Sequence, residues 1–252
     1  MIDAEDVHKE LGGKEVLKGA SLHVEEGEAL AIIGTSGEGK TVFLKHLAGF
    51  FQPDSGRILV DGHDLGKARG RELESLRERF GFLFQGGALF QSMTIHDNVA
   101  FPLLEKTDLA RSEVEERVRK QLELVGLEDA AEKFPAEVSG GMAKRAALAR
   151  ALVESPDIMF FDEPTTGLDP IIAHSIHELI ASVRERLGLT AIVVTHEIPS
   201  IFAIVDRVAM LHEGVIRFVG TPEELFGAED EVVDEFISGS MPPPWYWLKT
   251  LG

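Results

Sequence analysis

One stretch, Gly34-Thr35-Ser36-Gly37-Glu38-Gly39-Lys40-Thr41, constrains this chain more than any other. It matches the pattern G-x-x-x-x-G-K-[ST], follows an apolar run at residues 29–33 and precedes a helical pattern at residues 42–48, which begins with Val42. Glycines let the backbone curl until successive N–H groups face a phosphate, and the helix N-terminus adds partial positive charge. The Lys40 ammonium then reaches the β- and γ-phosphates, and the Thr41 hydroxyl ligates Mg²⁺. The stretch therefore predicts a loop that binds nucleotide phosphates, and a glycine-rich turn that contains lysine by chance is the weaker interpretation.

A second apolar run, at residues 158–161, ends in the two carboxylates Asp162 and Glu163. Asp162 is suited to hold Mg²⁺ through a water molecule. Glu163 would then face the γ-phosphate and polarise the attacking water. Alone the pattern is weak, because strands often end in acidic turns. Beside a phosphate loop it gains weight, because nucleotide hydrolysis needs a second anchor for Mg²⁺.

Short β-branched runs alternate with longer helical patterns along the chain. The apolar runs at residues 29–33, 158–161 and 191–194 are typical of buried strands in a parallel sheet, which predicts an α/β fold. Residues 208–219 predict a hairpin with Glu213-Gly214 at its turn. Residues 108–125 predict a charged amphipathic helix that ends at Gly126.

Composition excludes several classes of protein. The chain has 252 residues, a formal net charge of −18 and no cysteine. It therefore has no disulfide framework and no thiolate metal site, and its acidity argues against a general nucleic-acid binder. Three of the first six residues are acidic and none is basic, and no apolar run approaches the roughly 20 residues of a membrane-spanning helix. We expect a cytosolic protein whose link to a membrane comes through a partner.

Further motifs occur between and after the phosphate loop and the Asp162-Glu163 pair. Ser139-Gly140-Gly141 opens a helical run at residues 142–152, and His196 follows the apolar run at 191–194. Together with Gln85 and with Thr166-Gly167-Leu168-Asp169, these motifs occur in an order that resembles the ATPase subunits of ABC transporters. The resemblance extends over residues 7–219. It implies that Gln85 is the Q-loop glutamine, that Asp169 belongs to the D-loop and that His196 is the switch histidine.

The resemblance implies a P-loop NTPase fold of the α/β class, the ABC nucleotide-binding domain. That fold has a RecA-like core sheet, an N-terminal antiparallel β subdomain and a helical signature subdomain, here at about residues 87–153. The ATPase domain would span residues 1–240, followed by a tail at residues 241–252. The implied cofactors are ATP and Mg²⁺.

The family arrangement implies that two copies of the chain enclose two ATP molecules. One copy would supply the phosphate loop, Gln85, Asp162, Glu163 and His196, and the other would supply Ser139, Gly140 and Gly141. Thr41, Gln85 and Asp162 would surround Mg²⁺. Ser139 at a helix start is an anion site in its own right, and the plain alternative is a helix N-cap. The plain alternative for His196 is a surface histidine at a strand end.

Two positions depart from the family pattern. Met142 stands where the signature usually has glutamine, and it cannot donate a hydrogen bond as glutamine does. By its spacing from residues 16–19, Leu11 occupies the position of the aromatic that stacks on adenine in most relatives. Leu11 and Val16 offer apolar contact without stacking, so the preference for ATP over GTP stays open.

The signature variant at residues 139–145 and the segment at residues 85–103 are similar to the ATPases of the maintenance-of-lipid-asymmetry (Mla) systems. That resemblance implies phospholipid transport between bacterial inner and outer membranes. It also implies an integral-membrane permease, a mammalian-cell-entry-type lipid-binding protein and a STAS-domain protein as partners. The subunit would be peripheral on the inner face of the inner membrane. Residues 88–101 would receive a cytoplasmic helix of the permease, unless Leu89, Phe90 and Phe101 are core residues.

Two other functions remain open. The ATPase subunit of a polar-solute importer would be expected to have glutamine at position 142. A soluble non-transport ABC ATPase would usually have two cassettes or a long coiled-coil insert. In the tail, Pro242-Pro243-Pro244 is followed by Trp245-Tyr246-Trp247. Since burying aromatics requires a partner surface, the tail is expected to dock on a second subunit, on a regulatory partner or on its own domain.

Overall fold

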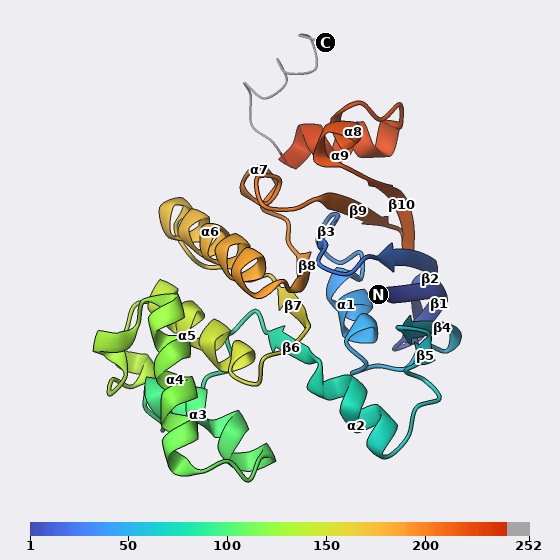
Figure 1. Ribbon diagram of the computed structural model, residues 1–252. Coiled ribbons are helices and arrows are strands. Elements are labelled where there is room, and N and C mark those ends of the chain that lie inside the picture. The colour runs from blue at the N-terminus through green and yellow to red at the C-terminus, as the bar shows by residue number, and fades with distance from the viewer. Residues whose placement is uncertain (241–252) are drawn as a thin grey trace. The chain divides into compact units, whose positions relative to one another are not determined.

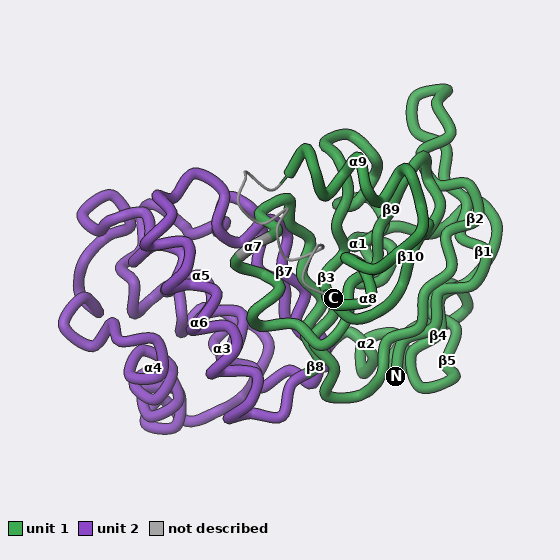
Figure 2. Tube along the Cα trace, turned by 90° about the horizontal axis from the view of Figure 1, so that it is seen from above, with its two compact units in different colours: residues 1–77, 190–252 green, residues 78–189 purple. Residues whose placement is uncertain are grey.

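The computed structural model describes residues 1–240. Residues 241–252 lie outside the described residues, and with them the predicted docking of Trp245, Tyr246 and Trp247. The chain divides into two compact units (Figure 2). Residues 1–77 and those from 190 onward form the first unit, and residues 78–189 form the second unit.

The first unit contains an antiparallel sheet of four strands in the order β2-β1-β4-β5. Its strands are β1 (Ile2–Leu11), β2 (Lys14–Val24), β4 (Ser55–Val60) and β5 (His63–Asp64). The β1–β2 turn is Gly12-Gly13, with φ angles of 60° and 80°, values that glycine adopts without a steric penalty. Val16 and Leu17 on β2 bring this sheet next to the phosphate loop, because both side chains lie close to Gly39.

The first unit also contains the parallel strands on which the phosphate loop depends. Strand β3 (Ala29–Ile33) pairs in parallel with β8 (Thr190–Val194) on one side and with β9 (Arg207–His212) on the other. Every residue of β3 and β8 is buried, which confirms the interpretation of these runs as fully covered strands. Strand β10 (Val215–Gly220) returns antiparallel to β9 through the predicted Glu213-Gly214 turn.

The helices of the first unit are short. They are α1 (Lys40–Leu47), α2 (Arg71–Glu78, which ends one residue inside the second unit), α7 (Ile198–Ile201), α8 (Pro222–Phe226) and α9 (Glu231–Ser240). Thr221 and Glu224 form a capping box that starts α8, so part of the acidic segment at residues 221–240 satisfies a helix end.

The second unit contains two parallel strands and a group of helices (Figure 1). Its elements are β6 (Phe80–Leu83), α3 (Ile95–Lys106), α4 (Arg111–Val125), the 3-10 turns η1 (Glu128–Ala130) and η2 (Pro135–Glu137), α5 (Gly140–Leu152), β7 (Ile158–Asp162) and α6 (Pro170–Leu187). Helix α4 ends at the predicted Gly126, which has a left-handed φ of 67°. The helices α3, α4 and α5 fall within residues 87–153, and the boundaries of a helical subdomain stay a prediction.

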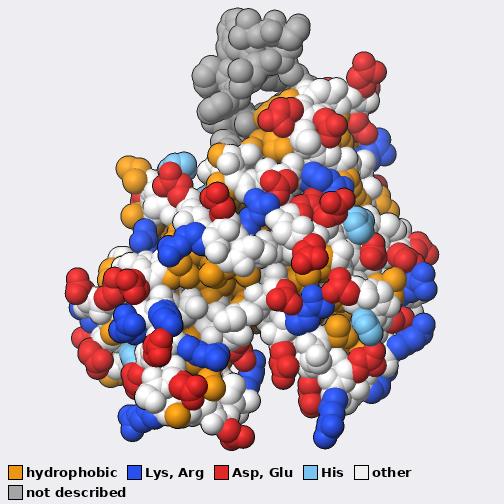
Figure 3. Space-filling view, viewed as in Figure 1, with side chains coloured by type: hydrophobic (Ala, Val, Ile, Leu, Met, Phe, Trp, Pro, Cys, Tyr) orange, Lys and Arg blue, Asp and Glu red, His pale blue; other side chains and the backbone are white. Residues whose placement is uncertain are grey.

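The surface carries both signs of charge. Figure 3 shows acidic and basic side chains interspersed over the visible face, so the net charge of −18 is not gathered into one patch there. Among residues 1–240, no helix combines the length and the apolar character needed to cross a membrane.

Candidate nucleotide-binding site

The phosphate loop takes a backbone path that only glycine follows at two positions. Gly34 has a φ of 147°, and a Cβ added there would overlap the backbone oxygen of Leu211. Gly39 has a φ of 98°, and its added Cβ would lie 2.8 Å from the Val16 Cγ1 atom. The loop is therefore held close to β9 and β2, and α1 begins directly after it at Lys40.

The Lys40 side chain lies inside the curve of the phosphate loop. It is buried, and its Nζ atom donates to the backbone oxygens of Gly34 at 2.8 Å and of Thr35 at 2.9 Å. Thr41 and Val42 are half-buried in the first turn of α1, while Ser36 and Gly37 are exposed. A curled backbone around a fixed ammonium at a helix start fits the chemistry of a phosphate group.

Glu38 is a part of the loop whose role the sequence motif does not define. Its carboxylate accepts hydrogen bonds from the Thr35 hydroxyl at 3.0 Å and from the backbone N–H of Glu213. The same carboxylate lies 3.8 Å from the Nδ1 atom of His212. Glu38 thus joins the phosphate loop to the β9–β10 turn, and no local sequence signal points to a residue so distant along the chain.

The parallel pairing of β3 and β8 brings His196 to the same sheet edge as the loop. Ile32 lies opposite Val194, so Gly34 and His196 each lie two residues beyond that pair. His196 is exposed and lies two residues after the end of β8. Its role toward the γ-phosphate stays a prediction.

The two residues predicted for the adenine end differ in their surroundings. Val16 is half-buried and lies next to Gly39, so it is placed beside the phosphate loop. Leu11 is 41% exposed at the end of β1, opposite Lys14 at the hairpin tip. Adenine contact by either residue stays a prediction.

In the second unit, Gln85 and the two carboxylates also share one sheet edge. Strands β6 and β7 pair in parallel with Leu83 opposite Phe161, so Gln85 and Glu163 both follow that pair by two residues. Ligand sites of parallel sheets form at the carboxyl ends of strands. Asp162 is 5% exposed at the last position of β7. The pairing therefore gives Gln85, Asp162 and Glu163 a common location.

Glu163 adopts an unusual backbone conformation. Its φ is 50°, in the left-handed region that non-glycine residues seldom occupy and that often marks functional sites. Its carboxylate accepts a hydrogen bond from the Thr166 hydroxyl at 3.2 Å. Position and orientation of this carboxylate are both constrained by the turn that follows β7.

Ser139 is the N-cap of α5. Its hydroxyl oxygen accepts from the backbone N–H of Met142 at 3.3 Å, which confirms the capping interpretation. That bond uses only the main chain of Met142. The cap and an anion-binding role are compatible, because an exposed helix start with a serine is itself suited to a phosphate oxygen.

The two signature glycines lie against the segment that contains Asp169. A Cβ at Gly140 would lie 3.2 Å from the Leu168 Cδ2 atom, and one at Gly141 would lie 2.6 Å from the Ile172 Cγ2 atom. Asp169 caps α6, since its Oδ1 atom accepts hydrogen bonds from the backbone N–H groups of Ile171 and Ile172 at 3.1 Å each. The signature and the predicted D-loop therefore pack closely within the second unit.

Sequence comparisons show the family to which the chain belongs. The family model described as "ABC transporter" matches residues 17–166. The chain is 41% identical over 97% of its length to the intermembrane phospholipid transport system ATP-binding protein MlaF of Haemophilus influenzae, covering 92% of that protein. The corresponding figures for MlaF of Escherichia coli K12 are 40%, 97% and 91%. For the probable ribonucleotide transport ATP-binding protein mkl of Mycobacterium leprae they are 40%, 94% and 69%.

Solved structures show the same fold. The cbiO1 protein from Clostridium perfringens, part of the ABC transporter complex cbiONQ, matches with a TM-score of 0.84 at 30% identity, covering 98% of both chains. A dimeric post-hydrolysis state of the ATP-binding cassette MJ0796 bound to ADP and Pi matches with a TM-score of 0.79 at 30% identity, covering 88% of this chain and 98% of the other. These matches confirm the predicted fold class. The chain belongs to the ABC transporter family, as an ATP-hydrolysing nucleotide-binding subunit.

Proposed function

We propose that this ABC ATPase supplies the energy for phospholipid transport through a membrane permease. The observation that carries the proposal is the identity to two proteins named MlaF, which extends over nearly the whole chain. A nucleotide-binding subunit does not touch the transported molecule, so the substrate class follows from these relatives and not from the chemistry of the site.

The residues of the phosphate loop would bind the nucleotide. The backbone amides after Gly34 and the Lys40 ammonium would hold the phosphates. The Thr41 hydroxyl, the Gln85 amide oxygen and the Asp162 carboxylate are all oxygen donors, the kind of ligand that Mg²⁺ prefers, and they would hold the ion. When bound, Mg²⁺ supplies neutralisation of the charge that develops on the phosphoryl oxygens.

Glu163 would act as the general base toward water. Its carboxylate follows a buried strand, and the Thr166 hydroxyl fixes one of its oxygens. The carboxylate would then accept a proton from the water that attacks the γ-phosphate. His196, at the edge that also carries the phosphate loop, would orient the γ-phosphate by a hydrogen bond.

Each site would be completed by a second copy of the chain. Ser139 at the start of α5 is exposed, and its backbone surroundings are those of an anion site. The dimeric state of the ATP-binding cassette MJ0796 supports this arrangement. ATP would favour the closed dimer because it contacts both copies, and hydrolysis would release them.

The partner proteins would bring the subunit to the membrane. Phe90 and Leu104, which lie before and within α3, are 42% and 59% exposed, so they are available to a cytoplasmic helix of a permease. Phe90 packs on the Phe101 ring at a centroid distance of 4.8 Å, which makes the pair one apolar surface. The subunit would lie on the inner face of the inner membrane, with a STAS-domain protein and a mammalian-cell-entry-type protein as further partners.

A second candidate is transport of a polar solute such as a ribonucleotide. It is favoured by 40% identity over 94% of the chain to the M. leprae protein named mkl. The two candidates predict the same ATPase chemistry and differ only in the transported molecule.

One experiment separates the candidates. The chain is co-expressed with the permease of its operon, the complex is purified through a tag on the permease, and bound small molecules are identified by mass spectrometry. Phospholipid enriched over the surrounding membrane, with ATPase activity stimulated by lipid and abolished in Glu163→Gln, supports the proposal. Enrichment of nucleotides outside the phosphate-loop site supports the second candidate, and failure to copurify with any permease contradicts both.

A further inference from the structure

The helix that begins at the signature also holds the segment that contains Gln85. Lys144 on α5 is 8% exposed, and its Nζ atom donates to the backbone oxygen of Gln85. Six residues further along, the Arg150 guanidinium donates to the backbone oxygens of Ala88 at 2.7 Å and of Gly87 at 3.1 Å. Two cations of one helix therefore bind three backbone oxygens of one short segment.

The backbone of this segment requires such support. Gly87 and Ala88 have consecutive left-handed φ angles of 71° and 51°, and the Gly87 N–H donates to the Phe84 oxygen at 2.8 Å. A non-glycine residue in this region is strained unless its surroundings hold it. Arg150 also lies 5.8 Å from the centroid of the Phe90 ring, and burial lowers the pKa of Arg150. Arg150 thus contacts both the backbone of the segment and the Phe90 ring.

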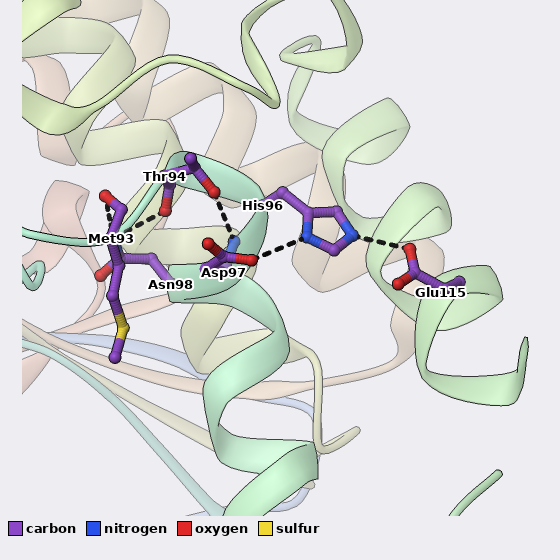
Figure 4. A network of polar contacts seen from close by, with 6 residues as sticks. All are labelled: Met93, Thr94, His96, Asp97, Asn98 and Glu115. Atoms are coloured by element: carbon purple, nitrogen blue, oxygen red, sulfur yellow. Dashed lines mark hydrogen bonds and ion pairs between the residues drawn. The ribbon is translucent and has the colours of Figure 1, made fainter. Parts of the chain in front are cut away.

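A buried asparagine holds the far end of the segment. The Asn98 side chain accepts from the Phe90 N–H at 2.7 Å and donates to the backbone oxygens of Phe90 at 3.0 Å and Met93 at 3.2 Å. Figure 4 shows Asn98, in the first turn of α3, beside Met93. Asn98 thus holds residues 90–94, while the hydrogen bonds from α5 hold the backbone oxygens of residues 85, 87 and 88.

We propose that Lys144 and Arg150 are positioning residues that set the location of Gln85 and link it to Ser139 through the rigid body of α5. Fixing the main chain of Gln85 limits where its side-chain amide can reach, so the helix start that contacts one ATP is linked mechanically to the Mg²⁺ ligand of the other. The inference rests on the proposed role of Gln85. Charge-assisted hydrogen bonds from partly desolvated cations are strong enough to serve as such a link.

The test compares three cations of α5. Lys144→Met removes the bond to Gln85 at similar volume, and Lys144→Arg keeps a cation. Arg145→Met is the matched control, because Arg145 donates to the backbone oxygen of Val125 at the end of α4 instead. Arg150→Lys is the second variant should Lys144→Met not fold, since a single ammonium does not reproduce the two-pronged contact of a guanidinium.

Two measurements are made on each full-length variant. Amide hydrogen exchange, without nucleotide, is followed for residues 86–90 and for residues 126–127, and steady-state kinetics separate kcat from KM for ATP. We expect Lys144→Met to speed exchange at residues 86–90 and to lower kcat about ten-fold with little change in KM, because the variant loses a charge-assisted hydrogen bond and alters no residue of the phosphate loop. Lys144→Arg restores both, and Arg145→Met speeds exchange only at residues 126–127.

Gln85→Ala separates a failure of the proposed Gln85 role from a failure of the positioning role of Lys144 and Arg150. If Gln85→Ala hydrolyses ATP at the wild-type rate, the proposed role of Gln85 is wrong, whatever the exchange data show. If Gln85→Ala is impaired while Lys144→Met and Arg150→Lys change neither kcat nor exchange at residues 86–90, the positioning role is overturned. A loss of kcat that appears equally in Arg145→Met also overturns it, because the effect is then one of general stability.

Discussion

The Nζ atom of Lys40 lies 2.8 Å from the backbone oxygen of Gly34, so the first glycine and the lysine of the phosphate loop are joined across the loop. The hydrogen bond places the ammonium within the curve of the backbone. It also makes the loop sensitive to any shift of Gly34, which lies against the backbone of Leu211.

We expect Gly34→Ala to destabilise the protein far more than Gly37→Ala. Both glycines have a left-handed φ, 147° and 86°, but only Gly34 has backbone atoms in the space of a new Cβ, whereas Gly37 has nothing within 4 Å. Strain alone predicts a loss of about 1 kcal/mol for Gly37→Ala, and the added overlap predicts a total of about 3 kcal/mol for Gly34→Ala. Urea unfolding of both variants measures the difference, and equal losses would contradict the close approach to Leu211.

Mixing two inactive variants tests whether each site takes residues from two copies. Ser139→Ala and Glu163→Gln are each expected to abolish hydrolysis in their own homodimers. In a mixed dimer, one site has both changes and the other has neither, so activity returns if Ser139 acts on the ATP of the other copy. Random mixing of a two-fold dimer predicts about a quarter of wild-type product.

The assay for the mixed dimers is a single-turnover measurement of phosphate release, since a dead site slows reopening of the dimer. Ser139→Ala also removes the N-cap of α5, which predicts a stability loss of about 1 kcal/mol. Ser139→Asp is a matched control that keeps the cap and repels phosphate. Mixtures without recovered activity would mean that Ser139 serves the site of its own copy.

His177 makes the protein sensitive to acid. It lies on the buried face of α6, and neither ring nitrogen has a hydrogen-bond partner among the described residues. Burial, with a small contribution from His174, lowers its pKa from 6.5 to about 4. Since the unfolded chain binds this proton at a higher pH than the folded chain does, stability falls as the pH falls from 6.5 toward 4.

We therefore expect His177→Leu to flatten the dependence of stability on pH. The wild type should lose up to about 2 kcal/mol through this residue between pH 7 and pH 5, and the variant should not. His174→Leu is the control, because the His174 side chain is 58% exposed. Equal slopes for wild type and His177→Leu in urea unfolding at the two pH values would show that His177 does not govern acid stability.

The contribution of His96 to stability depends on pH in the opposite direction. Burial alone would lower its pKa, but hydrogen bonds from its ring to Asp97 at 3.3 Å and to Glu115 at 2.8 Å raise the pKa above 6.5 (Figure 4). The charged ring links α3 to α4, and the stability it adds is fully present below pH 6.5 and is lost as the pH rises through the raised pKa. Glu116, Arg119 and Glu128 line the adjoining pocket.

Glu115→Gln should lower the pKa of His96 and destabilise the protein more at pH 6 than at pH 8.5. Glu116→Gln is the control, because Glu116 pairs with Lys120 at 2.6 Å instead. An NMR titration of the His96 ring in the three proteins measures the shift. An unchanged pKa in Glu115→Gln would mean that the contact to Glu115 does not form in solution.

Much of the fold follows from local patterns. Residues 29–33 and 191–194 are apolar throughout because both faces of β3 and β8 are covered, and such a run admits few alternatives to a buried strand. Gly126 and the Glu213-Gly214 turn mark element ends because left-handed backbone favours glycine. The phosphate loop was predictable for the same reason, since its glycines are required by backbone geometry.

Other features depend on contacts that sequence patterns do not encode. Lys144 could have been placed on the buried face of α5, because it lies three residues after Gly141 and four before Leu148, which are both buried. Its acceptor, the backbone oxygen of Gln85, could not be predicted, since a main-chain atom leaves no signature in the residue type. The packing that leaves the His177 ring without a hydrogen-bond partner among residues 1–240 likewise has no signature in the sequence.

The carboxylate of Glu38 changes how the motif of the phosphate loop is to be interpreted in this chain. Its position is one that the pattern leaves to any amino acid, yet here it accepts hydrogen bonds from Thr35 and from the β9–β10 turn. A library that randomises the variable positions of the loop should therefore recover a restricted set of residues at position 38 and a broad set at position 36. The family pattern allows any residue at the variable positions, but the contacts within one member can restrict which residues that member accepts there.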